Sequence, residues 1–395
     1  MTDTIPPSLI PLRGNWNYPT SIRFGAGRIA ELPKACETAG IASPLLVTDP
    51  GLAKLPMVAN ALKACKDSGL GVALFSDLRG NPVAKNVEDG LKAFRSGRHD
   101  GVIAFGGGSA LDCAKVIAFM AGQTRPMWDF EDIGDWWTRA DPAGIKPVVA
   151  VPTTSGTGSE TGRAGVITDE TTHTKKIIFH PNMMPAVDIA DPELTIGLPP
   201  HITAATGMDA LAHCLEAYCA PFYHPYADGV AVEGTRLIAA WLPKAVADGK
   251  DIEARSHMMA AAGMGSTAFQ KGLGAINSLS HPLGSVLDTH HGLTNAVVMP
   301  YVFAFNRPAI EEKMVRLGRY IGLRDATWNG VMDWVLTLRE QIGIPHTLKD
   351  LGMSDSHVAR FSEMALVDPC TGGNPIKIGI AELSRMYQAA LAGSL

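Results

Sequence analysis

Short apolar runs alternate with helix-like segments between residues 44 and 154, and this alternation constrains the fold more than any other feature. Strands buried on both faces read as continuous apolar runs, and helices between them are typical of parallel crossovers. The pattern therefore predicts a Rossmann-like, doubly wound α/β sheet, with ligands bound beyond the carboxyl ends of its strands. The apolar runs are PLLVTD (44–49), GVALFS (71–76), GVIAFG (101–106) and PVVAVPTT (147–154).

From about residue 200 onward, strand-like runs give way to segments with helical spacing, broken by Gly and Pro. Pro199-Pro200 marks a boundary between the two halves. We expect an α/β dinucleotide-binding domain over residues 1–198, an all-helical metal and substrate domain over residues 199–395, and the chemistry in the cleft between them. The expected helices cover residues 202–219, 226–246, 251–268, 309–321, 328–342 and 377–392.

The composition argues against several classes of protein. The chain has 395 residues, of which 46% are hydrophobic and 18% charged, with a net charge of −5 and a pI near 6.2. This balance, without a long Lys/Arg block, argues against nucleic-acid binding. The N-terminus lacks the features of a signal peptide, the apolar stretches are too short to span a bilayer, and the cysteines show no CxxC spacing. We expect a soluble, cytoplasmic protein with reduced thiols and no membrane partner.

Two glycine-containing loops follow predicted strands. Gly106 to Ser109 lies between a strand and a helix, where backbone N–H groups and the helix dipole can bind a phosphate. The loop is not G-x-G-x-x-G, and a tight strand-to-helix turn explains it equally well. The hydroxyl-rich segment 152–160, PTTSGTGSE, is by itself typical of a solvated loop. Because both loops fall at the same sheet edge, we interpret them together as contacts for phosphate, ribose or nicotinamide.

Asp49 ends the first apolar run. A carboxylate there can accept hydrogen bonds from ribose hydroxyls and would repel a 2′-phosphate, which favours NAD over NADP. The alternative is that Asp49 caps the segment that follows, because Asp is a good N-cap residue.

Asp209 and His213 are four residues apart in GMDALAHCLEAY, so both point from the same face of a predicted helix. Alone, such a pair is more typical of a helix surface. His281 in SHPLGS and His291 in THHGLTN can join it, and a carboxylate with imidazoles is typical of a first-row divalent metal site. The nucleotide-type loops upstream favour this second interpretation.

Six motifs, in order along the chain, resemble those of the iron-containing (group III) alcohol dehydrogenases. They are GGGSALDCAK, PTTSGTGSE, ADPELT, GMDALAHCLEAY, HPLG and HHGLTNAVVMPY, and the resemblance extends from about residue 20 to the C-terminus. It implies a nucleotide-binding α/β domain, an all-α metal domain and NAD(P)-linked interconversion of a small alcohol with an aldehyde or ketone. A homodimer or higher homo-oligomer is expected.

The resemblance also assigns individual residues. It implies Asp209, His213 and His291 as metal ligands, and places His281 near the nicotinamide, where it is our candidate for relaying a proton. A lysine of the pair Lys175/Lys176 is implied to reach the ribose, with the count slightly favouring Lys175. Further cofactor contacts are implied at Asp49, Asn81, Gly107, Gly108, Ser109, Asp112, Thr153, Thr154, Thr157, Thr195 and Leu198.

The chain departs from the family pattern at residue 277. Family members have a ligand histidine four residues before the HPLG histidine, whereas this chain reads GLGAINSLSHPLG, with Asn277 at that position. An amide oxygen is a weaker ligand than imidazole nitrogen for such ions. Three outcomes follow: Asn277 or water completes the shell, His281 substitutes, or the site is weakly occupied or empty. Ligand type alone does not separate iron from zinc.

The expected reaction is hydride transfer between NADH and a carbonyl carbon, with the metal as a Lewis acid at the oxygen. One rival is a metal-independent reductase of the maleylacetate type, which Asn277 favours and the intact Asp209, His213 and His291 do not. A branch related to glycerol dehydrogenase and dehydroquinate synthase shares the fold but has a different ligand set. A non-enzymatic rival is a nucleotide-binding regulator with a decayed metal site.

Overall fold

The computed structural model describes residues 14–16 and 19–395. A seven-stranded sheet, in the order β1-β2-β9-β6-β5-β3-β4, lies at the centre of the first half of the chain. β1 pairs antiparallel with β2, and every other neighbouring pair is parallel. The strands are β1 (Gly14–Trp16), β2 (Ser21–Phe24), β3 (Pro44–Val47), β4 (Ala73–Phe75), β5 (Gly101–Gly106), β6 (Val148–Pro152) and β9 (Val187–Ala190).

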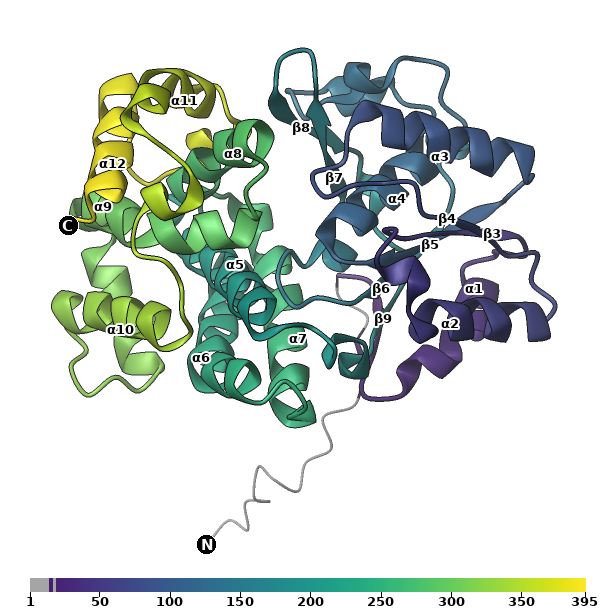
Figure 1. The fold of residues 1–395 in the computed structure, drawn as a ribbon, viewed down its shortest axis with the longest axis horizontal. Coiled ribbons are helices and arrows are strands. Elements are labelled where there is room, and N and C mark those ends of the chain that lie inside the picture. The colour runs from purple at the N-terminus through teal and green to yellow at the C-terminus, as the bar shows by residue number, and fades with distance from the viewer. Residues whose placement is uncertain (1–13, 17–18) are drawn as a thin grey trace, which may run out of the picture.

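Helices cover both faces of this sheet, as predicted. α1 (Leu32–Thr38) and α2 (Pro56–Asp67) lie on one face, and α3 (Ala84–Ser96) and α4 (Gly108–Met120) lie on the other (Figure 1). Alternate residues of a strand point to opposite faces. In β5, for example, Ile103 packs in the core beneath α1 and α2, whereas Val102 packs in the core beneath α4. The double burial explains the continuous apolar runs and confirms the α/β class.

A separate antiparallel hairpin, β7 (Ala164–Asp169) and β8 (Thr174–Phe179), lies between the sheet domain and the helices, with β8 near α8 (Figure 1). The sequence analysis predicted neither strand. The hairpin sequences AGVITD and TKKIIF mix polar and apolar residues, because only one face of the hairpin packs in the core. β9 and the β1–β2 pair were also missed, and all three are strands of only three or four residues.

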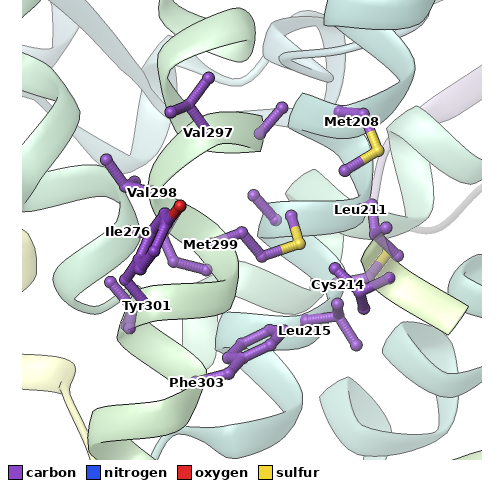
Figure 2. Packing of buried hydrophobic residues seen from close by; sticks show 14 of the residues in the cluster. Met208, Leu211, Cys214, Leu215, Ile276, Val297, Val298, Met299, Tyr301 and Phe303 are labelled. Atoms are coloured by element: carbon purple, nitrogen blue, oxygen red, sulfur yellow. The ribbon is translucent and has the colours of Figure 1, made fainter. Parts of the chain in front are cut away.

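Eight helices form the second half of the described chain. α5 is buried over nearly its whole length, and a helix that is apolar on all sides is typical of a protein interior. Figure 2 shows Met208, Leu211 and Leu215 of α5 in the same core as Met299 and Phe303 of α9. The helices are α5 (Pro200–Cys219), α6 (Pro225–Ala247), α7 (Ile252–Ala268), α8 (Ala275–Leu287), α9 (His291–Tyr320), α10 (Trp328–Gln341), α11 (Val358–Leu366) and α12 (Ile380–Ala392).

Two expectations for this half were wrong. The segment 309–321 is the end of a 30-residue helix that starts at His291, and α8 and α11 were not predicted at all. Proline inside a helix normally interrupts it, which explains why α8 and the first part of α9 were missed: Pro282 lies within α8, and Pro300 and Pro308 lie within α9.

The six cysteines are all buried and free of disulfide bonds, as predicted. Among the described helices, none has the length and hydropathy needed to span a bilayer.

Candidate active site

The two glycine-containing loops pack against each other at the carboxyl edge of β5 and β6. A Cβ atom added at Gly107 would lie 3.2 Å from Cγ2 of Thr154, and one added at Gly108 would collide with the side chain of Thr157. Gly107 is also the N-cap residue of α4, and no side chain caps that helix end. The first turn of α4 therefore offers free backbone N–H groups beside a hydroxyl-bearing loop, which is the geometry expected for a phosphate site.

Two polar residues border this edge. The backbone N–H of Asn81 donates to Oγ of Ser109 at 3.3 Å, and its side-chain Nδ2 donates to Oδ1 of Asp288 at 2.8 Å, which links the α/β domain to the end of α8. Oδ1 of Asp49 accepts hydrogen bonds from the N–H groups of Gly51 and Leu52 at 2.8 and 2.9 Å. Asp49 therefore caps the turn that follows it, and Oδ2 takes part in neither bond.

Other predicted cofactor residues are held by contacts within the protein. Asp112 accepts hydrogen bonds from Oγ of Ser159 at 2.6 Å and from the N–H of Val166 at 3.0 Å, so it fixes the second loop and the hairpin. Thr153 and Thr195 are buried, and Leu198 is half-buried at the junction with α5. A direct contact of these four residues with a cofactor stays a prediction.

The two adjacent lysines of β8 point to opposite sides of the hairpin. Nζ of Lys176 forms ion pairs with Asp169 at 3.1 Å and Glu131 at 3.6 Å. Lys175 points toward α8, where a Cβ at Gly284 would be 3.0 Å from its Nζ. Burial lowers the pKa of Lys175 below its usual value, and Asp209 and other carboxylates offset only part of this shift. Of the two lysines, Lys176 is held in ion pairs, so Lys175 is the better candidate to contact a ligand.

Asp209, His213 and His291 form a cluster in which one potential ligand atom of each residue lies within 4.8 Å of the others. Oδ1 of Asp209 is 3.6 Å from Nε2 of both histidines. Asp209 and His213 project from α5, and His291 is the first residue of α9. A carboxylate with two imidazoles is a donor set typical of non-haem Fe(II) sites.

The protonation of His291 suits a metal ligand. Oγ of Ser280 donates to the backbone oxygen of Asn277 at 2.9 Å, so it accepts a hydrogen bond from Nδ1–H of His291 at 3.1 Å. The lone pair of Nε2 therefore faces the cluster. Burial, followed by the nearby charge of Lys175, holds the pKa of His291 well below its usual range, so that the ring is neutral.

Asn277 faces the same cluster. Its Nδ2 donates to Oε2 of the buried Glu216 at 2.7 Å, and this bond turns Oδ1 toward Nε2 of His291, 3.1 Å away. Glu216 also accepts the N–H of Ile276 at 2.6 Å. In the tautomer with the proton on Nδ1, the lone pairs of Asn277 Oδ1 and His291 Nε2 face each other. The Nδ2 of Asn295 donates to Oδ1 of Asp209 at 2.8 Å and lies 3.1 Å from Nε2 of His291. The acceptor atoms of Asp209, Asn277 and His291 thus share the amide group of Asn295 as a donor. A bound cation would reduce the repulsion between their lone pairs.

His281 lies beside the cluster and is not one of its members. Its ring stacks on that of His291 with centroids 5.1 Å apart, and its Nδ1–H donates to Oδ2 of Asp368 at 2.7 Å. Burial favours a higher pKa for Asp368, but His281 and a hydrogen bond from the N–H of Cys370 lower the pKa overall. Asp368 therefore accepts the Nδ1 proton and leaves Nε2 of His281 for another partner.

Several residues of this site were not identified from the sequence. Asp368 is 87 positions from His281, so no local spacing indicated the pair. Glu216 and Asn295 lie three and four residues after His213 and His291, a helical spacing that could have indicated them. A cavity of about 220 Å³ between β2, β9 and α7 lies elsewhere, and none of the candidate ligands lines it.

The structure thus holds a metal-type cluster on α5 and α9 and a phosphate-type loop at the start of α4, and Asn81 bridges the two halves through Ser109 and Asp288. This combination is typical of a nucleotide-dependent oxidoreductase. Comparison with known families agrees. Residues 19–192 match the model described as "Iron-containing alcohol dehydrogenase", and residues 203–391 match "Fe-containing alcohol dehydrogenase family, C-terminal".

Individual relatives match over nearly the whole chain. A 4-hydroxybutyrate dehydrogenase from Cupriavidus necator is 38% identical, covering 95% of this chain and 99% of the relative. The crystal structure of a 1,3-propanediol oxidoreductase superposes with a TM-score of 0.89 at 36% identity, covering 94% and 97% of the two chains. A sulfoacetaldehyde reductase from Bifidobacterium kashiwanohense in complex with NAD⁺ superposes with a TM-score of 0.84 at 29% identity, covering 97% and 99%.

The chain belongs to the iron-containing alcohol dehydrogenase family. It is an NAD-dependent oxidoreductase that interconverts an alcohol with an aldehyde or ketone and uses a metal. The comparisons do not favour the metal-independent reductase or the regulatory protein.

Proposed function

We propose that this enzyme binds NAD(H) at the carboxyl edge of β5 and β6 and a divalent metal at Asp209, His213 and His291, with Oδ1 of Asn277 as a fourth donor. The observation that carries the proposal is the convergence of these four acceptor groups, because neutral imidazoles and a carboxylate facing an amide oxygen form an electron-rich site. Glu216 supports it by holding the amide so that oxygen, not nitrogen, faces the cluster.

Two nitrogen and two oxygen donors favour iron or manganese over zinc when compared with the family's three-histidine set. Bound there, the metal supplies Lewis acidity at the substrate oxygen. Iron is our preferred metal. Substitution by His281 is disfavoured, because His281 is not among the residues whose ligand atoms lie within 4.8 Å of one another at Asp209, His213 and His291.

The remaining roles follow from position. We assign the ribose contact to Lys175, because Lys176 is already paired with Asp169 and Glu131. Asp49 disfavours a 2′-phosphate. His281 exchanges a proton with solvent or ribose through Nε2, while Asp368 fixes the ring. The other contacts proposed for NAD are those at Asn81, Gly107, Gly108, Ser109, Asp112, Thr153, Thr154, Thr157, Thr195 and Leu198.

The setting of the enzyme is also a proposal. We infer a cytoplasmic homodimer or higher homo-oligomer, with domains at residues 1–198 and 199–395. The substrate is a small alcohol or the corresponding carbonyl compound. The relatives named for 4-hydroxybutyrate and sulfoacetaldehyde support substrates that also carry an acid group, and the one named for 1,3-propanediol supports a neutral diol.

The test is metal analysis of protein purified without chelator, combined with NADH oxidation in the presence of a panel of aldehydes. We expect bound metal and a turnover that chelation removes and added iron restores. His291→Gln should lose metal, whereas the adjacent His290→Gln should retain it, because His290 caps α9 and lies outside the cluster. Turnover that survives chelation would contradict the metal-dependent reaction, and NADH binding without turnover would contradict the enzymatic role.

A further inference from the structure

One face of the β7–β8 hairpin forms a mostly apolar wall on the side of α8. Ile167 and Ile178 point to the opposite face, into the core beneath α4. Because alternate residues of a strand point to opposite faces, Val166 and its partner Ile177 lie on the same face as Lys175, whose Nζ lies near Gly284 of α8. The next pair along this face is Ala164 and Phe179. The residues named on this face are half-buried, as expected for a wall that a ligand can reach.

Arg163 lies at the far end of this wall. Its guanidinium is placed over the ring of Phe179, 5.6 Å from the centroid, and its Nη2 donates to Oε1 of Gln270 at 3.1 Å. Phe269, the neighbour of Gln270, makes an edge-to-face contact with the ring of His213, with centroids 5.1 Å apart. Arg163 is therefore connected to the metal cluster through only two intervening residues.

The charge of Arg163 is available to a ligand. Among the described residues, no carboxylate forms an ion pair with its guanidinium, and its hydrogen-bond partner Gln270 is neutral. Burial raises the pKa of Asp132, and the nearby charge of Arg163 offsets part of this rise. The two side chains form no ion pair. A guanidinium that solvent can reach and that has no carboxylate partner is well suited to bind a carboxylate or sulfonate in a bidentate manner.

We propose that Arg163, assisted by Gln270, binds the acid group of a short-chain substrate whose other end carries the reacting hydroxyl or aldehyde. The substrate's carbon chain would lie along Val166, Ile177 and Phe179, with its oxygen at the metal cluster. This proposal rests on the proposed function, since it assumes that the reacting end lies at Asp209, His213 and His291. It makes Arg163 the residue that selects ω-hydroxy acids and their semialdehydes over uncharged alcohols and aldehydes.

The experiment compares kcat/KM with NADH for succinic semialdehyde and for butanal, which differ in the terminal acid. Wild type should prefer the semialdehyde. Arg163→Gln should lower kcat/KM for the semialdehyde by about tenfold to a hundredfold, mainly through KM, because a charge-assisted hydrogen-bond pair is lost. The value for butanal should change by less than about twofold, since that substrate makes no ionic contact. Arg163→Lys should recover part of the loss.

Arg316→Gln is the matched control, because Arg316 is exposed on α9 and pairs only with Glu312. It removes the same charge and should leave both substrates unchanged. A binding readout is independent of turnover: calorimetry should detect butanoate binding to the wild-type NAD⁺ complex and much weaker binding to Arg163→Gln.

Equal losses for both aldehydes in Arg163→Gln would overturn the proposal, as would a wild type without preference for the semialdehyde. Failure of the proposed function is distinguishable, because it would abolish turnover of both aldehydes in wild type. In that case the butanoate measurement still decides whether Arg163 binds an acid group.

Discussion

Replacing Asn277 by histidine should strengthen metal binding. Glu216 already accepts a hydrogen bond from Nδ2 of Asn277 at 2.7 Å, so it can accept one from Nδ1–H of an imidazole at this position. A ligand histidine whose second nitrogen is held by a carboxylate is a common arrangement at metal sites. The substitution thus replaces a neutral oxygen donor, 3.1 Å from Nε2 of His291, by a stronger nitrogen donor.

The expected gain in Asn277→His is at least tenfold in metal affinity, or about 1.4 kcal/mol, and larger for zinc than for iron. Competition with a fluorescent chelator measures this affinity directly, without any dependence on turnover. Asn277→Ala is the companion variant: it should weaken metal binding and also destabilise the fold by about 1–3 kcal/mol, because Glu216 loses a buried partner. Equal affinity for the wild type and both variants would show that residue 277 does not contact the metal.

Three further predictions concern the cofactor site and the buried acids. Asp49→Asn keeps an oxygen that can cap the turn but removes the charge, so the ratio of kcat/KM for NADH to that for NADPH should fall; a wild type that prefers NADPH would contradict the assignment. Lys175→Met should raise KM for NADH by about tenfold, whereas Lys176→Met should lower thermal stability with little change in KM, and the reverse pattern would exchange their roles. Burial raises the pKa of Glu160 to about 7, although Lys115 partly offsets this. The native state then holds more protons than the unfolded state between pH 4.5 and 7, so unfolding free energy should fall with rising pH across this window, and Glu160→Gln should flatten the curve in denaturant titrations.

The parts of the fold that follow from local pattern could be predicted from the sequence. The run GVIAFG is buried on both faces in β5, and the glycines after it lead into α4, as the alternation indicated. The β7–β8 hairpin could not be predicted in this way, because β8 begins with the polar residues Thr174, Lys175 and Lys176 and only one face of the hairpin packs in the core. Pro282 concealed α8, which supplies both Asn277 and His281.

The candidate ligands were visible in the sequence, but their supporting contacts were not. Asp209 and His213 share one helix, so their spacing revealed the pair. The orientation of the Asn277 amide depends on Glu216, 61 positions away, and the tautomer of His291 depends on Ser280. Arg163 could not be identified from the sequence, where it is only a charged residue after a loop, because its proposed role depends on the contact with Gln270. These are tertiary contacts, which local pattern does not encode.

The most direct test of the central claim is X-ray absorption spectroscopy of the purified protein at the edge of its bound metal. The account predicts a first shell of nitrogen and oxygen only, with outer-shell scattering from two imidazoles, those of His213 and His291. Asn277→His should raise this number to three. A sulfur ligand, three imidazoles in wild type, or protein that takes up no metal when iron is supplied would contradict the account.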